Sequence, residues 1–211
     1  MVSELENSSD MADVALLVLA SILKKWPSIL QNSLEFLLQI IIDSFSNQLN
    51  DNLFASSLTF SSALLPFITS FGCSDFFDFV IDVIPRFLTS QNETISIDAW
   101  GFLSALIEGL PLKIETLSLM ASQSLGEITK ENDIDLIGNV CYVFYLIAQK
   151  IEIDHDTIQH LIELVSSKIV DIQKDDTDNI QNIGMFLGLF LQNDSFKYDD
   201  RISTFISNHF Q

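Results

Sequence analysis

Two closely spaced carboxylates are the first residues in this sequence whose types and spacing could support chemistry. Asp78 and Asp82 lie four positions apart within the apolar stretch from Phe76 to Leu88. On a helix, residues four apart are neighbours on one flank. A carboxylate pair can act as general acid and base when it sits in a cleft that raises the pKa of one partner. The pair therefore admits a hydrolase hypothesis, provided that the fold supplies such a cleft.

The three histidines, by contrast, do not form a metal-binding pattern. His155 and His160 are five positions apart, which points their side chains in different directions on a helix, and His209 lies far along the chain. The sequence contains no phosphate-binding loop, dinucleotide fingerprint or nucleophile elbow. We therefore predict that the chain is not an enzyme, that it binds no metal and that it needs no cofactor.

Short acidic runs raise the question of calcium binding. They are Asp154 with Asp156, Asp175–Asp178, and Asp199 with Asp200. None is followed by the central glycine and closing glutamate of an EF-hand loop. All of them fall at expected turns, where carboxylates accept hydrogen bonds from the free amides at helix starts. Helix capping explains these runs better than calcium does.

The elements that position these residues follow from hydrophobic spacing. Phe77, Val80, Ile81, Ile84 and Leu88 lie at positions i, i+3, i+4, i+7 and i+11. This spacing predicts one apolar stripe along an α-helix rather than the alternation of a strand.

The same layout recurs along the chain. Equivalent stripes begin at Leu34, Phe77, Ile114, Ile158 and Ile202, so the spacings are 43, 37, 44 and 44 residues. A recurring unit of about forty residues is typical of helical-hairpin arrays, in which stacked units share a continuous core.

Each stripe is preceded by another expected helix with a strongly apolar centre. These first helices are predicted at Met11–Trp26, Leu53–Phe71, Thr94–Gly109, Ile134–Lys150 and Asn179–Gln192. Suitable capping residues are Ser74 with Asp75, Asn92, Asp154 and Asp178. Pro27 and Pro111 should lie where a turn ends and the second helix of a unit begins, whereas Pro66 and Pro85 should kink helices. In the last first helix, Gly184 and Gly188 should permit close packing.

This arrangement resembles HEAT repeats, and SALLPFITSFGCSDFFDFVIDVIPRFL resembles the paired helices of the importin-β/karyopherin family of nuclear transport receptors. NIQNIGMFLGLFLQN followed by YDDRISTFISNHF has a similar pattern. We expect an all-α fold, an α-solenoid of about five HEAT-like two-helix repeats. Residues 11–211 should form one domain after a disordered segment at residues 1–10. The resemblance implies transport of proteins between cytoplasm and nucleus, with cargo or a small GTPase as the partner. Adaptins, phosphatase scaffolds and condensin subunits share the same pattern.

Charge restricts the kind of partner. Ten Lys and Arg residues face 29 Asp and Glu residues, a net charge of −19. Nucleic acid and anionic membranes are repelled by such a field, whereas basic protein segments are attracted. The uncharged stretch from Asn52 to Ser74 is long enough to span a bilayer, but serine, threonine, Pro66 and Gly72 interrupt it, so we expect no membrane insertion. The apolar surroundings of Cys73 and Cys141 favour two buried thiols over one disulfide.

Equivalent positions on the second helices suggest a binding surface. The predicted partner-binding residues are Glu35, Asp78, Asp82, Glu115 and Glu163. In stacked hairpins these positions would align along the concave face and form an acidic strip, although a plain solvated flank would give the same pattern. We expect the strip to bind a basic protein segment. The alternative is a structural section of a larger HEAT-repeat scaffold, whose contacts are with neighbouring repeats.

Overall fold

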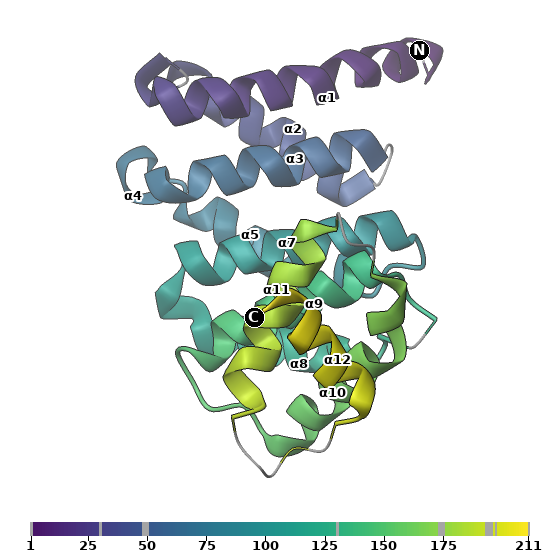
Figure 1. Ribbon diagram of the computed structural model, residues 1–211. Coiled ribbons are helices and arrows are strands. Elements are labelled where there is room, and N and C mark those ends of the chain that lie inside the picture. Colours follow the sequence, from purple (N-terminus) through teal and green to yellow (C-terminus); the bar gives the residue numbers. More distant parts are fainter. Residues whose placement is uncertain are drawn as a thin grey trace. The chain divides into compact units, whose positions relative to one another are not determined.

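The computed structural model of the chain contains α-helices and short 3₁₀ helices, and none of its described residues lies in a strand. It describes residues 2–29, 31–47, 51–129, 131–172, 176–192, 196 and 198–210; of these, the side chains of residues 2–11, 31, 47 and 171 are not described. The prediction of an all-α protein is therefore confirmed (Figure 1).

The contacts divide the chain into two compact units, Met1–Phe87 and Leu88–Gln211, each of which is described by itself. The expectation of one solenoid domain over residues 11–211 stays a prediction. The expected disorder of residues 1–10 also stays a prediction; the backbone from Val2 onward is drawn as the start of the first helix, and Met1 lies outside the described residues.

The first unit follows the expected order of helix pairs. Its elements are α1 (Val2–Lys25), η1 (Pro27–Ile29), η2 (Gln31–Ser33), α2 (Leu34–Asn47), α3 (Asp51–Leu64), η3 (Leu65–Phe67), α4 (Ile68–Phe71), α5 (Ser74–Val83) and α6 (Pro85–Leu88). Helix α1 packs lengthwise on α3 and buries Leu16, Ala20 and Leu23, a stripe with helical spacing (Figure 1).

Aromatic packing fixes the end of the first unit. The rings of Phe45, Phe54 and Phe87 are buried, with the centroids of Phe54 and Phe87 4.4 Å apart. The guanidinium of Arg86 lies over the ring of Phe87 and donates to the carbonyl of Phe45, near the C-terminus of α2. A cation at this helix end is favourable because the last carbonyls of a helix have no partner within it.

The second unit contains the remaining three pairs. Its elements are α7 (Glu93–Gly109), η4 (Pro111–Lys113), α8 (Ile114–Leu125), α9 (Ile134–Ala148), α10 (His155–Lys168), η5 (Ile169–Asp171), α11 (Thr177–Phe190) and α12 (Asp200–His209). Helix α9 packs between α7 and α11 and buries residues around most of its circumference. The chain turns by 108° between α7 and the η4–α8 segment, so α7 leads into a second helix of different direction.

Hydrogen bonds join the successive first helices of this unit, and the bonded residues are separated by nearly the same number of positions in the sequence. Asn139 Nδ2 donates to the carbonyl of Ile97 over 3.1 Å, and Asn179 Nδ2 donates to Asp135 Oδ1 over 2.5 Å. These partners are 42 and 44 residues apart in the sequence. Such spacing is what stacked repeats of about forty residues produce.

Several local expectations hold. Asn92 and Asp154 cap α7 and α10 through hydrogen bonds to the amides of Thr94 and Thr157. A contact not among these expectations ties α7 to the end of α6: the fully buried Trp100 donates from Nε1 to the carbonyl of Leu88, which also accepts from Ser96 Oγ. Cys73 and Cys141 are buried free thiols, and complete burial raises the pKa of Cys141 far above its ordinary value.

Other local expectations were wrong. The cap of α11 is Asp176 rather than Asp178, and α5 begins after Cys73 without a side-chain cap.

The expectation that Pro66 and Pro85 disturb helices agrees with the structure: the 3₁₀ turn η3 falls within the helical stretch Asp51–Phe71, and α6 begins at Pro85, directly after a one-residue break from α5. Proline lacks the amide hydrogen and clashes with the preceding turn, so it is better tolerated in the first turn of a new helix than inside a long one.

One stretch, Asp51–Phe71, is long and apolar enough to cross a membrane, and half of its most apolar window is buried in the structure. Buried core helices of soluble proteins share these properties. Length and composition alone therefore do not identify it as a membrane span.

We predict that Gly138 is required for the packing of α9 against α11. A Cβ added there would overlap sterically with the Asn179 side chain. That side chain cannot easily move away, because it is buried and held by hydrogen bonds to Asp135 and Asp176. Gly138→Ala should lower the free energy of unfolding by about 1–3 kcal/mol, measured by urea denaturation. The control is Gly188→Ala, where a Cβ meets nothing within 4 Å and should stabilise by up to about 1 kcal/mol. Equal effects of both substitutions would contradict this packing.

Candidate functional site

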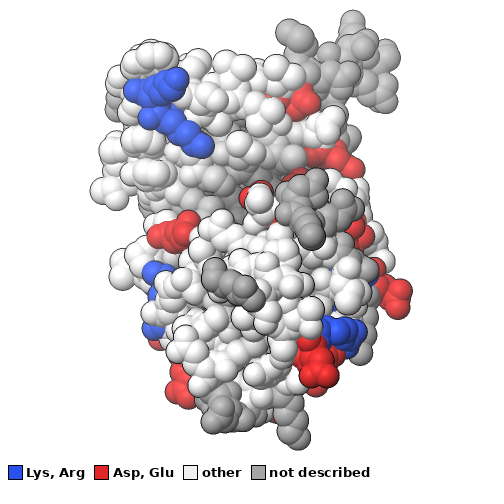
Figure 2. Space-filling view, in the orientation of Figure 1, with Lys and Arg blue, Asp and Glu red and all other residues white. Residues whose placement is uncertain are grey.

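The five residues predicted to bind a partner are all exposed. Glu35 lies on α2, Asp78 and Asp82 on α5, Glu115 on α8, and Glu163 on α10. The first three belong to the first unit and the other two to the second. Their alignment into one acidic strip therefore stays a prediction. On the face shown in Figure 2, acidic side chains are scattered over both units, whereas a basic cluster lies over the C-terminal end of α1.

The pair Asp78 and Asp82 shows no sign of a catalytic cleft. Both side chains are exposed on α5, and neither lines the cavities described below. A general acid in an enzyme usually needs burial or a close like charge to raise its pKa. The hydrolase hypothesis therefore gains nothing from the described residues.

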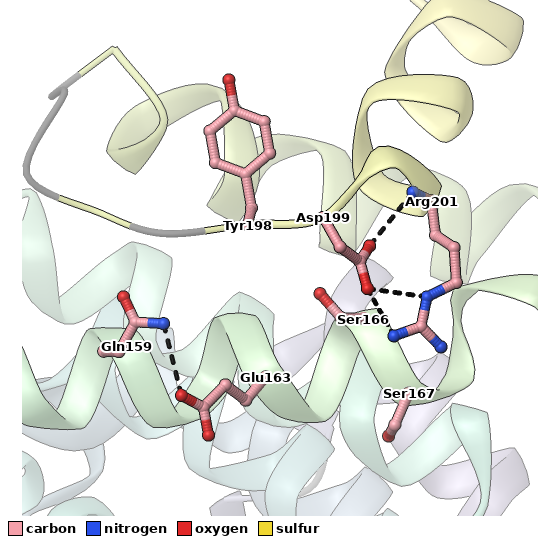
Figure 3. Close-up of a pocket in the computed structure, with 7 residues that line it drawn as sticks. All are labelled: Gln159, Glu163, Ser166, Ser167, Tyr198, Asp199 and Arg201. Atoms are coloured by element: carbon pink, nitrogen blue, oxygen red, sulfur yellow. Dashed lines mark hydrogen bonds and ion pairs between the residues drawn. The ribbon is translucent and has the colours of Figure 1, made fainter.

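Glu163, one of the five predicted residues, lines a groove. The groove lies in the second unit between α10 and the start of α12, and its volume is about 340 Å³ (Figure 3). Its lining consists of Gln159, Glu163, Ser166, Ser167, Tyr198, Asp199 and Arg201. The periodicity of α10 produces one side: Gln159, Glu163 and Ser166 follow one another at helical spacing, next to the buried stripe of Ile158, Leu161, Ile162 and Val165.

The carboxylate of Glu163 is only weakly hydrogen-bonded within the fold. It accepts one hydrogen bond from Gln159 Nε2 at 3.4 Å, which is long for an N–H···O bond. The side chain is exposed, so water or a ligand can reach the remaining lone pairs.

On the opposite side of the groove, Asp199 and Arg201 form a local ion pair. Asp199 is the N-cap of α12; its carboxylate accepts from the Arg201 amide at 3.0 Å and from Arg201 Nε at 2.7 Å, and the Nη2 group also donates to it. These bonds from Arg201 lower the pKa of Asp199 below its ordinary value. With two carboxylates and one guanidinium, the groove carries one uncompensated negative charge.

The remaining lining residues add polar groups to the groove. Ser167 Oγ donates to the carbonyl of Leu164 within its own helix, and the ring of Tyr198 points away from α10 (Figure 3). The lining contains no histidine, lysine or cysteine that could activate a serine. Its chemistry suits recognition of a cationic, hydrogen-bonding group.

A second cavity of about 200 Å³ lies between the start of α7 and the segment joining α8 to α9. The Glu93 carboxylate closes one side, because it accepts from Asn132 Nδ2 at 3.1 Å and from the Asp133 amide at 2.6 Å. Asp133 caps α9 in turn. Glu93 therefore ties the start of one helix to the start of the next, a structural role that satisfies its charge internally.

The sequence predicted some of the residues that line the groove but not all of them. Glu163 was found because it occupies the ladder position on a second helix, and the pair Asp199–Asp200 was correctly assigned to helix capping. Tyr198 and Arg201 were missed, since only the fold brings the start of α12 beside α10.

Among the described residues no group of three or more His, Cys, Asp or Glu side chains could hold a metal ion. His155 stacks on the ring of Phe196, and His209 lies against Phe205.

No protein-family model matches the chain, and no curated protein or solved structure was found to be significantly similar to it. The resemblance to HEAT repeats and to importin-β relatives therefore rests on the sequence pattern alone, and any functional conclusion must come from the residues themselves.

We predict that Arg201 controls the ionisation of Asp199. Arg201→Gln should raise the pKa of Asp199 toward the ordinary value of about 3.9, because the guanidinium bonds are its main stabilisation. In the wild type the stabilisation from this contact should be present above about pH 4 and lost as the pH falls through the lower folded-state pKa. NMR titration of the side-chain carboxyl carbon measures this shift.

The internal control is Asp154, whose pKa is lowered by hydrogen bonds from the Thr157 side chain and amide rather than by a cation. It should titrate identically in both proteins. An unchanged pKa of Asp199 in Arg201→Gln would show that the ion pair does not persist in solution.

Proposed function

We propose that this chain is a protein-binding scaffold of stacked HEAT-type helix pairs that holds a basic segment of another protein. The observation that carries the proposal is the groove beside α10, where Glu163 presents a weakly occupied carboxylate on a surface with a negative balance. The net charge of −19 would draw a basic segment toward the chain, and the groove would supply a short-range contact.

The helix pairing supports the scaffold part of the proposal. The hydrogen bonds that join α7, α9 and α11 at separations of 42 and 44 residues are compatible with a solenoid of about five repeats. A solenoid presents equivalent positions of successive second helices along one surface. Glu35, Asp78, Asp82, Glu115 and Glu163 would then extend the site beyond the groove.

The resemblance to importin-β/karyopherin receptors restricts the class of partner that we propose. It favours a cargo segment rich in lysine and arginine, or a basic small GTPase, and a working location in the cytoplasm and nucleus. Binding of this kind involves no reaction and no cofactor, since affinity comes from ion pairs and hydrogen bonds to the partner's cations.

We predict saturable binding of a labelled peptide of about ten residues that alternates lysine with serine, measured by fluorescence anisotropy. Glu163→Lys should weaken binding about tenfold, which corresponds to about 1.4 kcal/mol, because it replaces an attractive contact by a repulsive one. Affinity should also fall as salt increases, since exposed charges are screened.

The matched control is Glu152→Lys, which makes the same charge change at an exposed position of the second unit outside the groove. It should change affinity by less than about twofold. Equal weakening by both variants would show that only net charge attracts the peptide. Asp78→Lys extends the test to the first unit, where weakening is expected if the acidic strip is continuous. Absence of saturable binding would favour the alternative, a structural section of a larger HEAT-repeat scaffold.

A further inference from the structure

One hydroxyl group in the groove beside α10 has no hydrogen-bond partner among the described residues. Ser166 is 7% exposed and lines the groove, and no described group donates to its Oγ or accepts from it. In Figure 3 this oxygen points from α10 into the groove. The neighbouring Ser167 differs, because its hydroxyl donates to the carbonyl of Leu164 over 2.6 Å. Since a largely buried hydroxyl is costly unless it is hydrogen-bonded, Ser166 is placed to bond a group that enters the groove.

The carboxylate of Glu163 is a second acceptor that a ligand can reach, three positions earlier on the same helix. It accepts one bond, from Gln159 Nε2 at 3.4 Å. Side chains three apart on a helix are neighbours, so one ligand group can contact both Glu163 and Ser166. Asp199 is already engaged, because its carboxylate accepts from the amide and from the side chain of Arg201. Helix α10 therefore offers a charged and a neutral acceptor side by side.

Arg201 adds a donor on the opposite side of the groove. Its Nε and Nη2 groups both donate to Asp199, whereas no described group accepts from Nη1. A backbone carbonyl of a bound peptide is a complementary group for this donor. The groove volume of about 340 Å³ is near the lower end for ligand pockets, which fits one side chain with its adjoining backbone.

We propose that the groove binds an arginine side chain of the basic segment in preference to a lysine side chain; this inference rests on the protein-binding function proposed above. A guanidinium is planar and carries five N–H donors in a fixed fork, so it can direct two to the Glu163 carboxylate and another to Ser166 Oγ. A lysine ammonium is a compact point charge, which neutralises Glu163 but has no second edge of fixed direction. The peptide carbonyl accepts from Arg201 Nη1 with either side chain, so the preference comes from α10.

Three peptides of equal length and equal charge test this preference by fluorescence anisotropy. They alternate serine with lysine, with arginine, or with arginine methylated on both terminal nitrogens, which keeps the charge but blocks paired donation. The arginine peptide should bind about fivefold more tightly than the lysine peptide, because it makes at least one further hydrogen bond. The methylated peptide should bind no more tightly than the lysine peptide. Long-range attraction is the same for all three, since their charges are equal.

The variant Ser166→Ala separates the hydroxyl from the charge of the groove. It should weaken binding of the arginine peptide about fivefold and change binding of the lysine peptide by less than about twofold. The matched control is Ser167→Ala, which removes a hydroxyl that also lines the groove but is bonded within α10, and which should leave binding of both peptides unchanged. Urea denaturation of both variants checks that the fold is retained.

The outcomes distinguish this inference from the function on which it rests. If neither the arginine nor the lysine peptide binds saturably, the proposed binding function fails, and the arginine preference fails with it. If both bind with equal affinity, the binding function stands and the preference is wrong. Equal binding of methylated and unmodified arginine peptides, or equal weakening of the arginine and lysine peptides by Ser166→Ala, would also overturn the preference, because charge alone would then account for the affinity.

Discussion

The burial of α9 between α7 and α11 is the constraint on which the second unit depends. An isolated helix with apolar residues around most of its circumference would be insoluble, so α9 requires a neighbour on each side. Polar residues at its edges also fix that packing: Asn139 donates to the Ile97 carbonyl, and Asp135 accepts from the buried Asn179. Because buried polar groups are costly without partners, these bonds disfavour sliding of one helix past another. The groove beside α10 exists because this register places the second helices of successive pairs at defined positions.

Hydrophobic spacing predicted the second helices, such as α5 and α10, because each buries a stripe that is visible in the sequence at a period of 3.6 residues. The first helix α9, which buries residues around most of its circumference, was predicted from its strongly apolar centre. Asn92 and Asp154 were predictable as caps, since each is a short polar residue directly before a helix. At α11 two aspartates compete, and the choice of Asp176 depends on Asn179, whose amide nitrogens bond both to Asp176 and to Asp135 of another helix. Such a choice requires knowledge of tertiary contacts, which one sequence does not contain. The same limit applies to the groove: the ladder position identified Glu163, but Arg201 and Tyr198 reach it only through the path of the chain into α12.

Acidic residues in this chain serve two physically different purposes, and the structure separates them. Glu93, Asp133, Asp154, Asp176 and Asp199 accept hydrogen bonds from backbone amides near helix starts, so their charge is used within the fold. Glu163 is of a different kind, because it is exposed in the middle of α10 and accepts a long hydrogen bond from the side chain of Gln159 rather than bonds from backbone amides. A partner can compete for a carboxylate of the second kind at little cost, whereas engaging one of the first kind would uncap a helix and cost about 1 kcal/mol. Composition alone counts both kinds together, which is why a net charge overstates the surface available for binding.

Helix α11 is partly covered by the helix that follows it, α12, and by the residue after α12. The ring of Phe210 lies directly over Gly184, where a side chain would leave no space, and Phe205 packs beside Phe210. The glycine is thus explained by packing, as the sequence suggested for Gly184, whereas a Cβ at Gly188 would meet nothing within 4 Å. Two glycines at the same helical spacing therefore have different causes: Gly184 is required because a dense aromatic contact leaves no room for a side chain, and Gly188 is not required by any contact of this kind.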